Sequence, residues 1–304
     1  MSSSPRILAI RGGAIGDFIL TLPALRLLRE NFAQCRLEIL GYPHIAALAQ
    51  RCGPTDERTY ADAVHSIEYG PLAGFFTRRG DLDPALCEFF AGYQQVVSWL
   101  FDPDGIFEAN IRRAGVKNYL SAYTKVTADH HASAQLARGL ESMALFLDAP
   151  PAAVLRPTAD ILAQADAWLA GVGLQQGFTA IHPGSGSPRK NWPLAHWQAF
   201  AERMQSGILI IGGEADAAQL GVFPGHPRAQ NLPLPLLAGI LSRCGAYFGH
   251  DTGISHLAAA VGAKATLLFG PTPAAVWAPL GDHVRIIEAP DGDLALLPPD
   301  ILFP

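Results

Sequence analysis

The residues best suited to chemistry lie in segment 248–269, which reads FGHDTGISHLAAAVGAKATLLF. An apolar run from residue 245 leads into a polar turn at 249–251. A helix of small residues follows over about 252–261, and a second apolar run covers 264–269. A strand, a polar turn, a helix and a strand within about 25 residues form a βαβ unit of a parallel sheet. Chemistry is therefore expected where the first strand ends and the helix begins.

The polar side chains of this turn are suited to binding an anion. Backbone N–H groups at the start of a helix lack intrahelical partners, and together with the helix dipole they favour a phosphate. Gly253 allows the backbone to approach a ligand, Thr252 can donate its hydroxyl, and His256 lies about one turn further along the helix. The spacing fits equally well a capped helix, with Asp251 or Thr252 as the N-cap and His256 half-buried.

A second candidate for phosphate binding is the loop HPGSGSPRKNWP at 182–193, between an apolar strand at 178–181 and a helix at 194–204. Its glycines permit close backbone approach, its hydroxyls can donate, and its two cations can neutralise a diphosphate. The residues concerned are Gly184, Ser185, Gly186, Ser187, Arg189 and Lys190. A plain tight loop would have the same spacing.

An apolar strand at 6–10 is followed by the glycine-rich turn RGGAIGD. The turn lacks the GxGxxG spacing of a dinucleotide site and the GK[ST] ending of a P-loop, so it is weak as a cofactor motif. Its last residue, Asp17, places a carboxylate at the carboxyl end of a strand, the edge where open α/β sheets bind ligands. An aspartate at a helix start also interacts favourably with the helix dipole without any catalytic role.

Another acidic residue, Glu214, follows the apolar strand at 207–211 and could accept hydrogen bonds from ribose hydroxyls. Asp102 and Asp104 flank a proline after the strand at 93–101. Such a DxD motif can hold a divalent cation through hard carboxylate oxygens. Because similar pairs recur at Asp81 and Asp291, a turn is favoured at 102–104 and no metal site is expected.

Small basic clusters occur in the first half of the chain. They are Arg78, Arg79, Arg112 and Arg113. Such clusters are usually solvated surface, and contact with a phosphorylated acceptor is the minority interpretation.

The composition indicates a globular protein, with 49% hydrophobic and 16% charged residues among 304. A formal charge of −5 argues against general nucleic-acid binding, and four cysteines without a CxxC pair fit a reducing compartment. The start, MSSSPRILAIRGG, has no apolar run long enough for a signal peptide, and no window approaches the length of a membrane span. We expect a cytoplasmic protein, at most peripheral to a membrane.

The order of elements predicts an α/β protein with two domains, at 1–150 and 151–304. The two prolines at 150–151 mark the linker. Pro23 predicts a break or a fresh start near residue 21 in the first helix. A further helix is expected at 133–147, and residues 54–83 are expected to be less regular.

Together the motifs RGGAIGDFILTLPAL, HPGSGSPRKNWP, GGEAD and DTGISHLAAAVGAKATLLFGPT resemble glycosyltransferase family 9, the ADP-heptose:lipopolysaccharide heptosyltransferase family. The resemblance implies a GT-B architecture, in which two Rossmann-like domains with parallel sheets face each other across a cleft. It implies that the first domain binds the acceptor and the second the nucleotide sugar. It also implies an inverting, metal-independent transfer that needs no cofactor besides the donor. By this resemblance alone the donor is ADP-heptose, and the acceptor is a lipopolysaccharide-core-type or other glycan or glycolipid.

The resemblance also implies roles for individual residues. Asp17 matches the general base, Lys190 a cation on the donor phosphates, and Glu214 an acid near the nucleoside. The D-T/S-G-x-x-H signature around the diphosphate and sugar corresponds to Asp251, Thr252, Gly253 and His256, and the phosphate loop to Ser185, Gly186 and Arg189. A lipid-linked acceptor would require contact with the cytoplasmic face of the inner membrane.

Three alternatives remain from the sequence. An NAD(P)-dependent oxidoreductase would use the same kind of sheet, but it needs a GxGxxG and an acid about twenty residues further on. A nucleotide-sugar-binding protein without catalysis could keep the same motifs. A metal-dependent transferase of the GT-A type would use Asp102 and Asp104.

Overall fold

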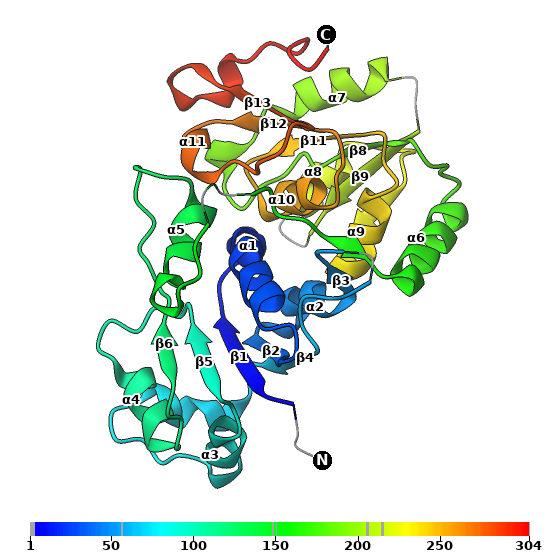
Figure 1. The fold of residues 1–304 in the computed structure, drawn as a ribbon. Coiled ribbons are helices and arrows are strands. Elements are labelled where there is room, and N and C mark those ends of the chain that lie inside the picture. The colour runs from blue at the N-terminus through cyan, green and yellow to red at the C-terminus, as the bar shows by residue number, and fades with distance from the viewer. Residues whose placement is uncertain are drawn as a thin grey trace. The chain divides into compact units, whose positions relative to one another are not determined.

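The computed structural model describes residues 4–55, 57–147, 149, 151–204, 207–213 and 216–303 (Figure 1). The chain forms two compact α/β units. The first comprises residues 1–127 and 132–150, and the second comprises residues 128–131 and 151–304. Each unit is described separately below.

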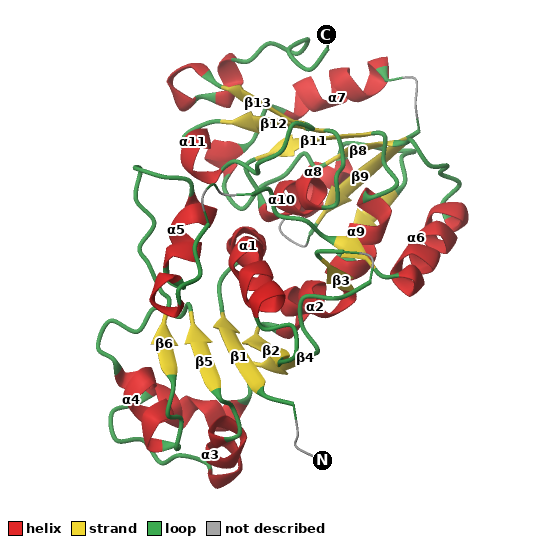
Figure 2. Cartoon of the chain, in the orientation of Figure 1, coloured by secondary structure: helices red, strands yellow, loops and turns green. Residues whose placement is uncertain are grey.

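The first unit contains a five-stranded parallel sheet in the order β4-β2-β1-β5-β6 (Figure 2). Its strands are β1 (Arg6–Arg11), β2 (Arg36–Gly41), β4 (Ala63–Ser66), β5 (Gln95–Ser98) and β6 (Tyr119–Ser121). A short strand, β3 (Cys52–Gly53), follows β2 in the chain. The chain moves outward from β1 in one direction and then returns to β5 on the other side. The carboxyl ends of β1 and β5 therefore form the topological switch point, where such sheets bind ligands.

The helices of the first unit are α1 (Ile15–Asn31), α2 (Pro43–Arg51), α3 (Pro84–Ala91), α4 (Ile106–Arg113) and α5 (Ala132–Arg138). Leu8 and Ile10 on one face of β1 join a buried cluster with Phe90 of α3 and Phe107 of α4. Residues 54–83 are less regular, as expected, because their described part consists of turns and loops apart from β4 and a 3-10 helix over Gly70–Phe76.

Two helix predictions are wrong in detail. Helix α1 runs unbroken through Pro23, because residues 18–25 are all buried and their packing offsets the one backbone hydrogen bond that a proline removes. The helix expected at 133–147 ends at Arg138. Gly139 follows, and a Cβ at that position would lie only 2.5 Å from the Ala122 carbonyl oxygen, so the chain turns away there.

The second unit contains a six-stranded parallel sheet in the order β10-β9-β8-β11-β12-β13. Its strands are β8 (Thr179–Ile181), β9 (Ile208–Gly212), β10 (Arg228–Gln230), β11 (Ala246–His250), β12 (Ala265–Phe269) and β13 (Val284–Glu288), and a short strand, β7 (Arg156–Pro157), precedes them. Its helices are α6 (Ala159–Gly171), α7 (Leu194–Arg203), α8 (Ala217–Gly221), α9 (Leu234–Leu241), α10 (Gly253–Ala260) and α11 (Ala274–Trp277). The predicted βαβ unit at 245–269 is confirmed as β11, α10 and β12. Here the switch point lies between β8 and β11.

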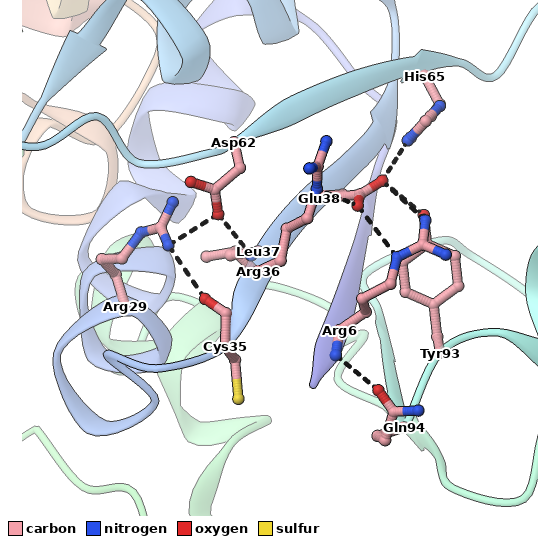
Figure 3. Close-up of polar contacts among 10 residues, drawn as sticks. All are labelled: Arg6, Arg29, Cys35, Arg36, Leu37, Glu38, Asp62, His65, Tyr93 and Gln94. Atoms are coloured by element: carbon pink, nitrogen blue, oxygen red, sulfur yellow. Dashed lines mark hydrogen bonds and ion pairs between the residues drawn. The ribbon is translucent and has the colours of Figure 1, made fainter. Parts of the chain in front are cut away.

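A buried carboxylate organises the amino-terminal edge of the first sheet (Figure 3). Glu38 on β2 is 2% exposed and accepts hydrogen bonds from Arg6, Arg36, His65 and Tyr93 at 2.6–3.2 Å. Burial alone would raise the pKa of Glu38, but the hydrogen bonds from Arg6, His65 and Tyr93 outweigh burial and lower the pKa to about 2. Glu38 therefore ties β1, β2, β4 and the segment before β5 together while it is ionised.

Replacing Glu38 with glutamine is expected to destabilise the first unit by about 1–3 kcal/mol at pH 7, because several donors lose a charged acceptor. A depressed folded-state pKa stabilises the protein above the unfolded value of 4.5, and this contribution disappears as the pH falls toward 2. Urea-unfolding midpoints should therefore differ between wild type and Glu38→Gln at pH 7 and converge as the pH falls. A difference that persists at pH 2 would contradict the assignment.

Within the described residues, no helix is both long and apolar enough to cross a membrane.

Candidate active site

The second unit brings two of the predicted loops together. Strands β8 and β11 are hydrogen-bonded neighbours, so the loop after β8 and the turn after β11 leave the same edge of the sheet at the switch point. The loop after β8 carries Ser185, Gly186, Arg189 and Lys190, and the turn after β11 carries Asp251, Thr252 and Gly253. Their convergence follows from the parallel register of the two strands.

Lys190 and Asp251 form the closest contact between these loops. The Lys190 Nζ lies 2.6 Å from the Asp251 Oδ2, and the two side chains are 32% and 11% exposed. The Lys190 ammonium is thus held at the start of α10. A cation and unpaired helix N–H groups at one point can together neutralise a diphosphate.

Thr252 is the N-cap of α10, and its Oγ1 accepts a hydrogen bond from the Ser255 N–H at 3.2 Å. The capped-helix interpretation of the sequence is therefore confirmed for Thr252. The Ser255 hydroxyl donates to the His250 carbonyl oxygen at 2.5 Å and lies 3.1 Å from the Tyr247 hydroxyl. The Thr252 hydroxyl can then donate to the Ser255 Oγ, 3.2 Å away, or to the His182 Nδ1, 3.3 Å away. An anion at this helix start would thus meet backbone N–H groups in preference to the Thr252 hydroxyl.

His182 and Asp216 also lie at this edge, although no sequence motif marked them as site residues. The His182 side chain is 5% exposed, and its Nε2 lies 3.3 Å from the Asp216 Oδ2, which also accepts the Gly213 N–H at 2.8 Å. Burial alone would raise the pKa of Asp216, but hydrogen bonds from His182 and Gly213 outweigh burial and lower it. The carboxylate orients the imidazole so that its Nδ1 faces Thr252. A histidine directly after an apolar strand was the only sequence signal for this pair.

Residue 184 has to be a glycine next to the His182–Asp216 pair, because a Cβ at this position would overlap the Asp216 carboxylate. Gly184→Ala is therefore expected to displace Asp216 and weaken binding at the switch point about 10-fold or more, since the overlap cannot be relieved without moving the loop. Calorimetric titration with ADP would measure the effect. Gly171→Ala, at the end of α6, is the control, because a Cβ there meets nothing within 4 Å. Equal affinities for the two variants would refute this role of Gly184.

His250 is fully buried beneath the phosphate loop. Its Nε2 accepts the Trp192 N–H at 2.8 Å, so the proton resides on Nδ1, which lies 3.3 Å from the Gly184 carbonyl oxygen. Burial is the main cause that lowers the pKa of His250 to about 3. The neutral ring thus holds both ends of the loop at any pH above about 4, one unit above that value.

The other residues predicted for the donor site bond within their own loop, lie exposed at the surface, or lie on the buried side of α10. The Ser185 hydroxyl donates to the Ser187 carbonyl oxygen at 2.7 Å, within its own loop, and Gly186 and Arg189 are exposed. His256 is 5% exposed on the buried side of α10. Glu214 lies outside the described residues.

In the first unit, Asp17 lies in the first turn of α1, directly after the carboxyl end of β1. Its Oδ2 accepts the Ala14 N–H at 3.1 Å, and its Oδ1 lies 4.0 Å from the Arg11 Nη2. The side chain remains 42% exposed. The carboxylate therefore caps the helix and is still accessible at the edge of the sheet.

The Arg11 side chain contacts Asp17 at the end of β1. Its side chain is 10% exposed and donates to the Asp17 carbonyl oxygen at 3.0 Å. Burial lowers the pKa of Arg11, and Asp17 and Tyr123 oppose this shift. The Arg11 guanidinium thus helps to fix the position of Asp17 at the start of α1.

Among the described residues, none of the four predicted acceptor arginines forms a hydrogen bond or ion pair with Asp17. Arg112 donates to Glu108 and to the carbonyl oxygen of Tyr119, the first residue of β6, so it lies at the opposite, amino-terminal edge of the sheet. Arg113 donates to Asn110 at 2.6 Å. The exposed Arg78 lies 3.6 Å from Asp104, and Arg79 is exposed.

The turn predicted at Asp102–Asp104 is confirmed. The two Asp102 carboxylate oxygens accept the N–H groups of Phe107 and Glu108 at the start of α4. Over the described ranges, no three His, Cys, Asp or Glu side chains cluster as metal ligands.

Comparison with known proteins identifies the family. The model of glycosyltransferase family 9 (heptosyltransferase) matches residues 109–295. Lipopolysaccharide heptosyltransferase 1 of Pseudomonas aeruginosa is 40% identical over 91 residues, which are 27% of this chain and 26% of that protein. The match thus spans about a quarter of the length of this relative.

Two solved structures share the fold along nearly the whole chain. The family 9 glycosyltransferase of Veillonella parvula superposes with a TM-score of 0.77 at 17% identity, covering 95% of this chain and 88% of that one. E. coli ADP-heptose lps heptosyltransferase II gives 0.74 at 14% identity, covering 98% and 96%. The predicted class, α/β with two Rossmann-like units and parallel sheets as in GT-B proteins, is confirmed. Because the family model covers well over half of the 304 residues, the chain belongs to glycosyltransferase family 9, the heptosyltransferase family.

Proposed function

We propose that this protein is an inverting glycosyltransferase that moves a heptose from ADP-heptose to a hydroxyl of a lipopolysaccharide-core-type glycan. The second unit would bind the donor, and the first unit the acceptor. The observation that carries the proposal is the grouping of Lys190, Asp251 and the start of α10 at the switch point of the second sheet. A cation beside unpaired helix N–H groups is the chemistry that a nucleoside diphosphate requires.

The proposed reaction is a single displacement. The acceptor hydroxyl oxygen bonds to the anomeric carbon of the donor, and the bond from that carbon to the diphosphate oxygen breaks with inversion. The hydroxyl proton passes to the Asp17 carboxylate, and the electron pair of the broken bond leaves with ADP. Charge that develops on the diphosphate would be met by the Lys190 ammonium and the first N–H groups of α10.

Lys190 would exchange partners during donor binding. In this structure its ammonium is paired with Asp251 at 2.6 Å. A diphosphate could take over that ammonium, and the displaced Asp251 carboxylate could then accept hydrogen bonds from sugar hydroxyls. The two residues would thus serve opposite ends of the same donor.

Names of the relatives support the choice of substrates. The relative from Pseudomonas aeruginosa is a lipopolysaccharide heptosyltransferase, and the solved E. coli protein is an ADP-heptose heptosyltransferase. By this proposal the protein acts in the cytoplasm, at the cytoplasmic face of the inner membrane when its acceptor is lipid-linked. It would need neither a metal nor a cofactor besides the donor.

Ligand binding tests the proposal directly. Calorimetric titrations with ADP, UDP, GDP and NAD, with and without Mg²⁺, should show that ADP binds best and that Mg²⁺ is not required. Transfer would then be assayed with ADP-heptose and a deacylated lipopolysaccharide core oligosaccharide. A preference for UDP or GDP would change the donor, and binding of NAD alone would contradict the proposal.

A further inference from the structure

Aromatic side chains surround the edge of the first sheet that carries Asp17. Tyr42 comes directly after β2, Phe101 lies three residues after β5, and Tyr123 lies two residues after β6. All three strands run parallel to β1, so the loops that follow them emerge at the same edge as the loop that leads to Asp17. The strands next to β1 on both sides thus each deliver an aromatic ring to this edge.

Two of these rings are exposed and adjacent. Phe101 is 69% exposed and Tyr123 is 40% exposed, and their ring centroids lie 5.2 Å apart with an interplanar angle of 52°. Phe101 has the largest exposed fraction of the large hydrophobic side chains in the described part of the chain. Neighbouring exposed rings that no other side chain covers commonly mark a binding surface.

The aromatic surface is connected to Asp17 through Arg11 and Gly12. Arg11 is the last residue of β1 and its Nη2 lies 4.0 Å from the Asp17 Oδ1, and Tyr123 follows β6 at the same edge of this sheet. A Cβ on Gly12 would lie 3.3 Å from Leu100 and 3.8 Å from the Tyr42 ring, so the glycine turn passes between these two side chains. Tyr42 and Leu100, the neighbour of Phe101, therefore lie beside the glycine turn that leads to Asp17.

Arg11 and Arg78 already have partners, whereas Lys125, two residues after Tyr123, is exposed. The side chain of Arg11 is buried beside Asp17, and Arg78 lies 3.6 Å from Asp104. Arg112 lies at the opposite edge of the sheet. The ring pair at this edge thus offers ring faces, which suit an uncharged, partly apolar ligand group.

We infer that Phe101 and Tyr123 form a stacking platform for one pyranose ring of the acceptor glycan and thereby direct a hydroxyl of that glycan toward Asp17. A pyranose has a face of C–H groups with positive partial charge, which the negative face of an aromatic ring attracts. Burying that face also removes apolar surface from water. This inference rests on the proposed function and identifies how the same site recognises its acceptor.

The test is a comparison of steady-state constants for Phe101→Ala, Tyr123→Ala and the double variant, with the deacylated core oligosaccharide as acceptor. Each single variant is expected to raise the acceptor KM about 10-fold, as loss of a stacking contact does, with a smaller change in kcat. ADP affinity should be unchanged, because both residues belong to the acceptor unit. Tyr123→Phe should keep the KM of wild type. Leu296→Ala, at a similarly exposed apolar residue of the second unit, is the control.

Two further measurements distinguish other occupants of the platform. The double variant would be tested for binding to phosphatidylglycerol vesicles and for its sedimentation coefficient. Loss of vesicle binding, or a change of oligomeric state, with an unchanged acceptor KM would overturn the inference in favour of a membrane or a second copy. If wild type binds ADP and transfers heptose while the double variant keeps its KM, this inference fails and the proposed function stands. If wild type neither binds ADP nor transfers, the proposed function itself fails.

Discussion

Asp17→Asn is expected to lower kcat by about 10²–10⁴-fold, the usual contribution of a positioned general base. The amide keeps the size of the carboxylate but cannot accept the proton of the attacking hydroxyl. The affinity for ADP should stay within about twofold, because Lys190 and α10 belong to the other unit. Steady-state kinetics and ADP calorimetry on the same preparation would measure both effects.

The structure also supplies the control for this variant. The Asp17 Oδ2 accepts the Ala14 N–H, and an asparagine oxygen can accept the same bond, so Asp17→Asn should retain the start of α1. Asp17→Ala removes the bond as well and should lower the thermal midpoint in addition to the rate. If Asp17→Asn turned over at the wild-type rate, the carboxylate would be only a helix cap.

Lys190→Ala is expected to weaken ADP binding by about 10–100-fold, since a charge-assisted hydrogen bond contributes about 1.5–3 kcal/mol. It should lower kcat as well, because the ammonium would stabilise the leaving diphosphate more strongly as charge develops on it. The change also leaves Asp251 without its cation at the start of α10. Calorimetry with ADP and single-turnover kinetics would separate binding from the chemical step.

Asp251→Asn complements Lys190→Ala, because it changes the other member of the same ion pair. It frees the Lys190 ammonium from its carboxylate and removes a negative charge next to the diphosphate, so ADP should bind as well as or better than to wild type. Turnover should fall if Asp251 holds the sugar. An unchanged affinity for ADP in Lys190→Ala would exclude this lysine from the phosphate site.

Much of the fold could be predicted from sequence because each unit obeys local rules. Apolar runs such as 178–181 and 264–269 are buried strands of parallel sheets, and glycine or polar turns mark their carboxyl ends. The βαβ segment around Asp251 followed from its own 25 or so residues. The break predicted near Pro23 is absent, because the packing of the whole helix α1 outweighs the low helix propensity of proline.

The candidate site was only partly predictable for a physical reason. Asp17, Lys190 and Asp251 stand at strand ends in motifs that can be recognised by themselves. His182 and Asp216 are 34 residues apart, and their contact depends on the register of β8 with β9, which no local pattern contains. The same holds for Glu38, whose partners Arg6, His65 and Tyr93 come from three other segments.

The Glu38 cluster and the candidate functional residues of the first unit lie at opposite edges of the same sheet. The group that ties the first sheet together is at the amino-terminal edge, and Asp17 with its aromatic neighbours is at the carboxyl edge. Mutation can therefore alter the two edges with little interference, since distant sites contribute independently to stability. During divergence, loop residues such as Phe101 and Tyr123 would be free to change and accept new glycans while the scaffold kept its stability. Families built on such a sheet can thus diversify their acceptors without redesigning the fold.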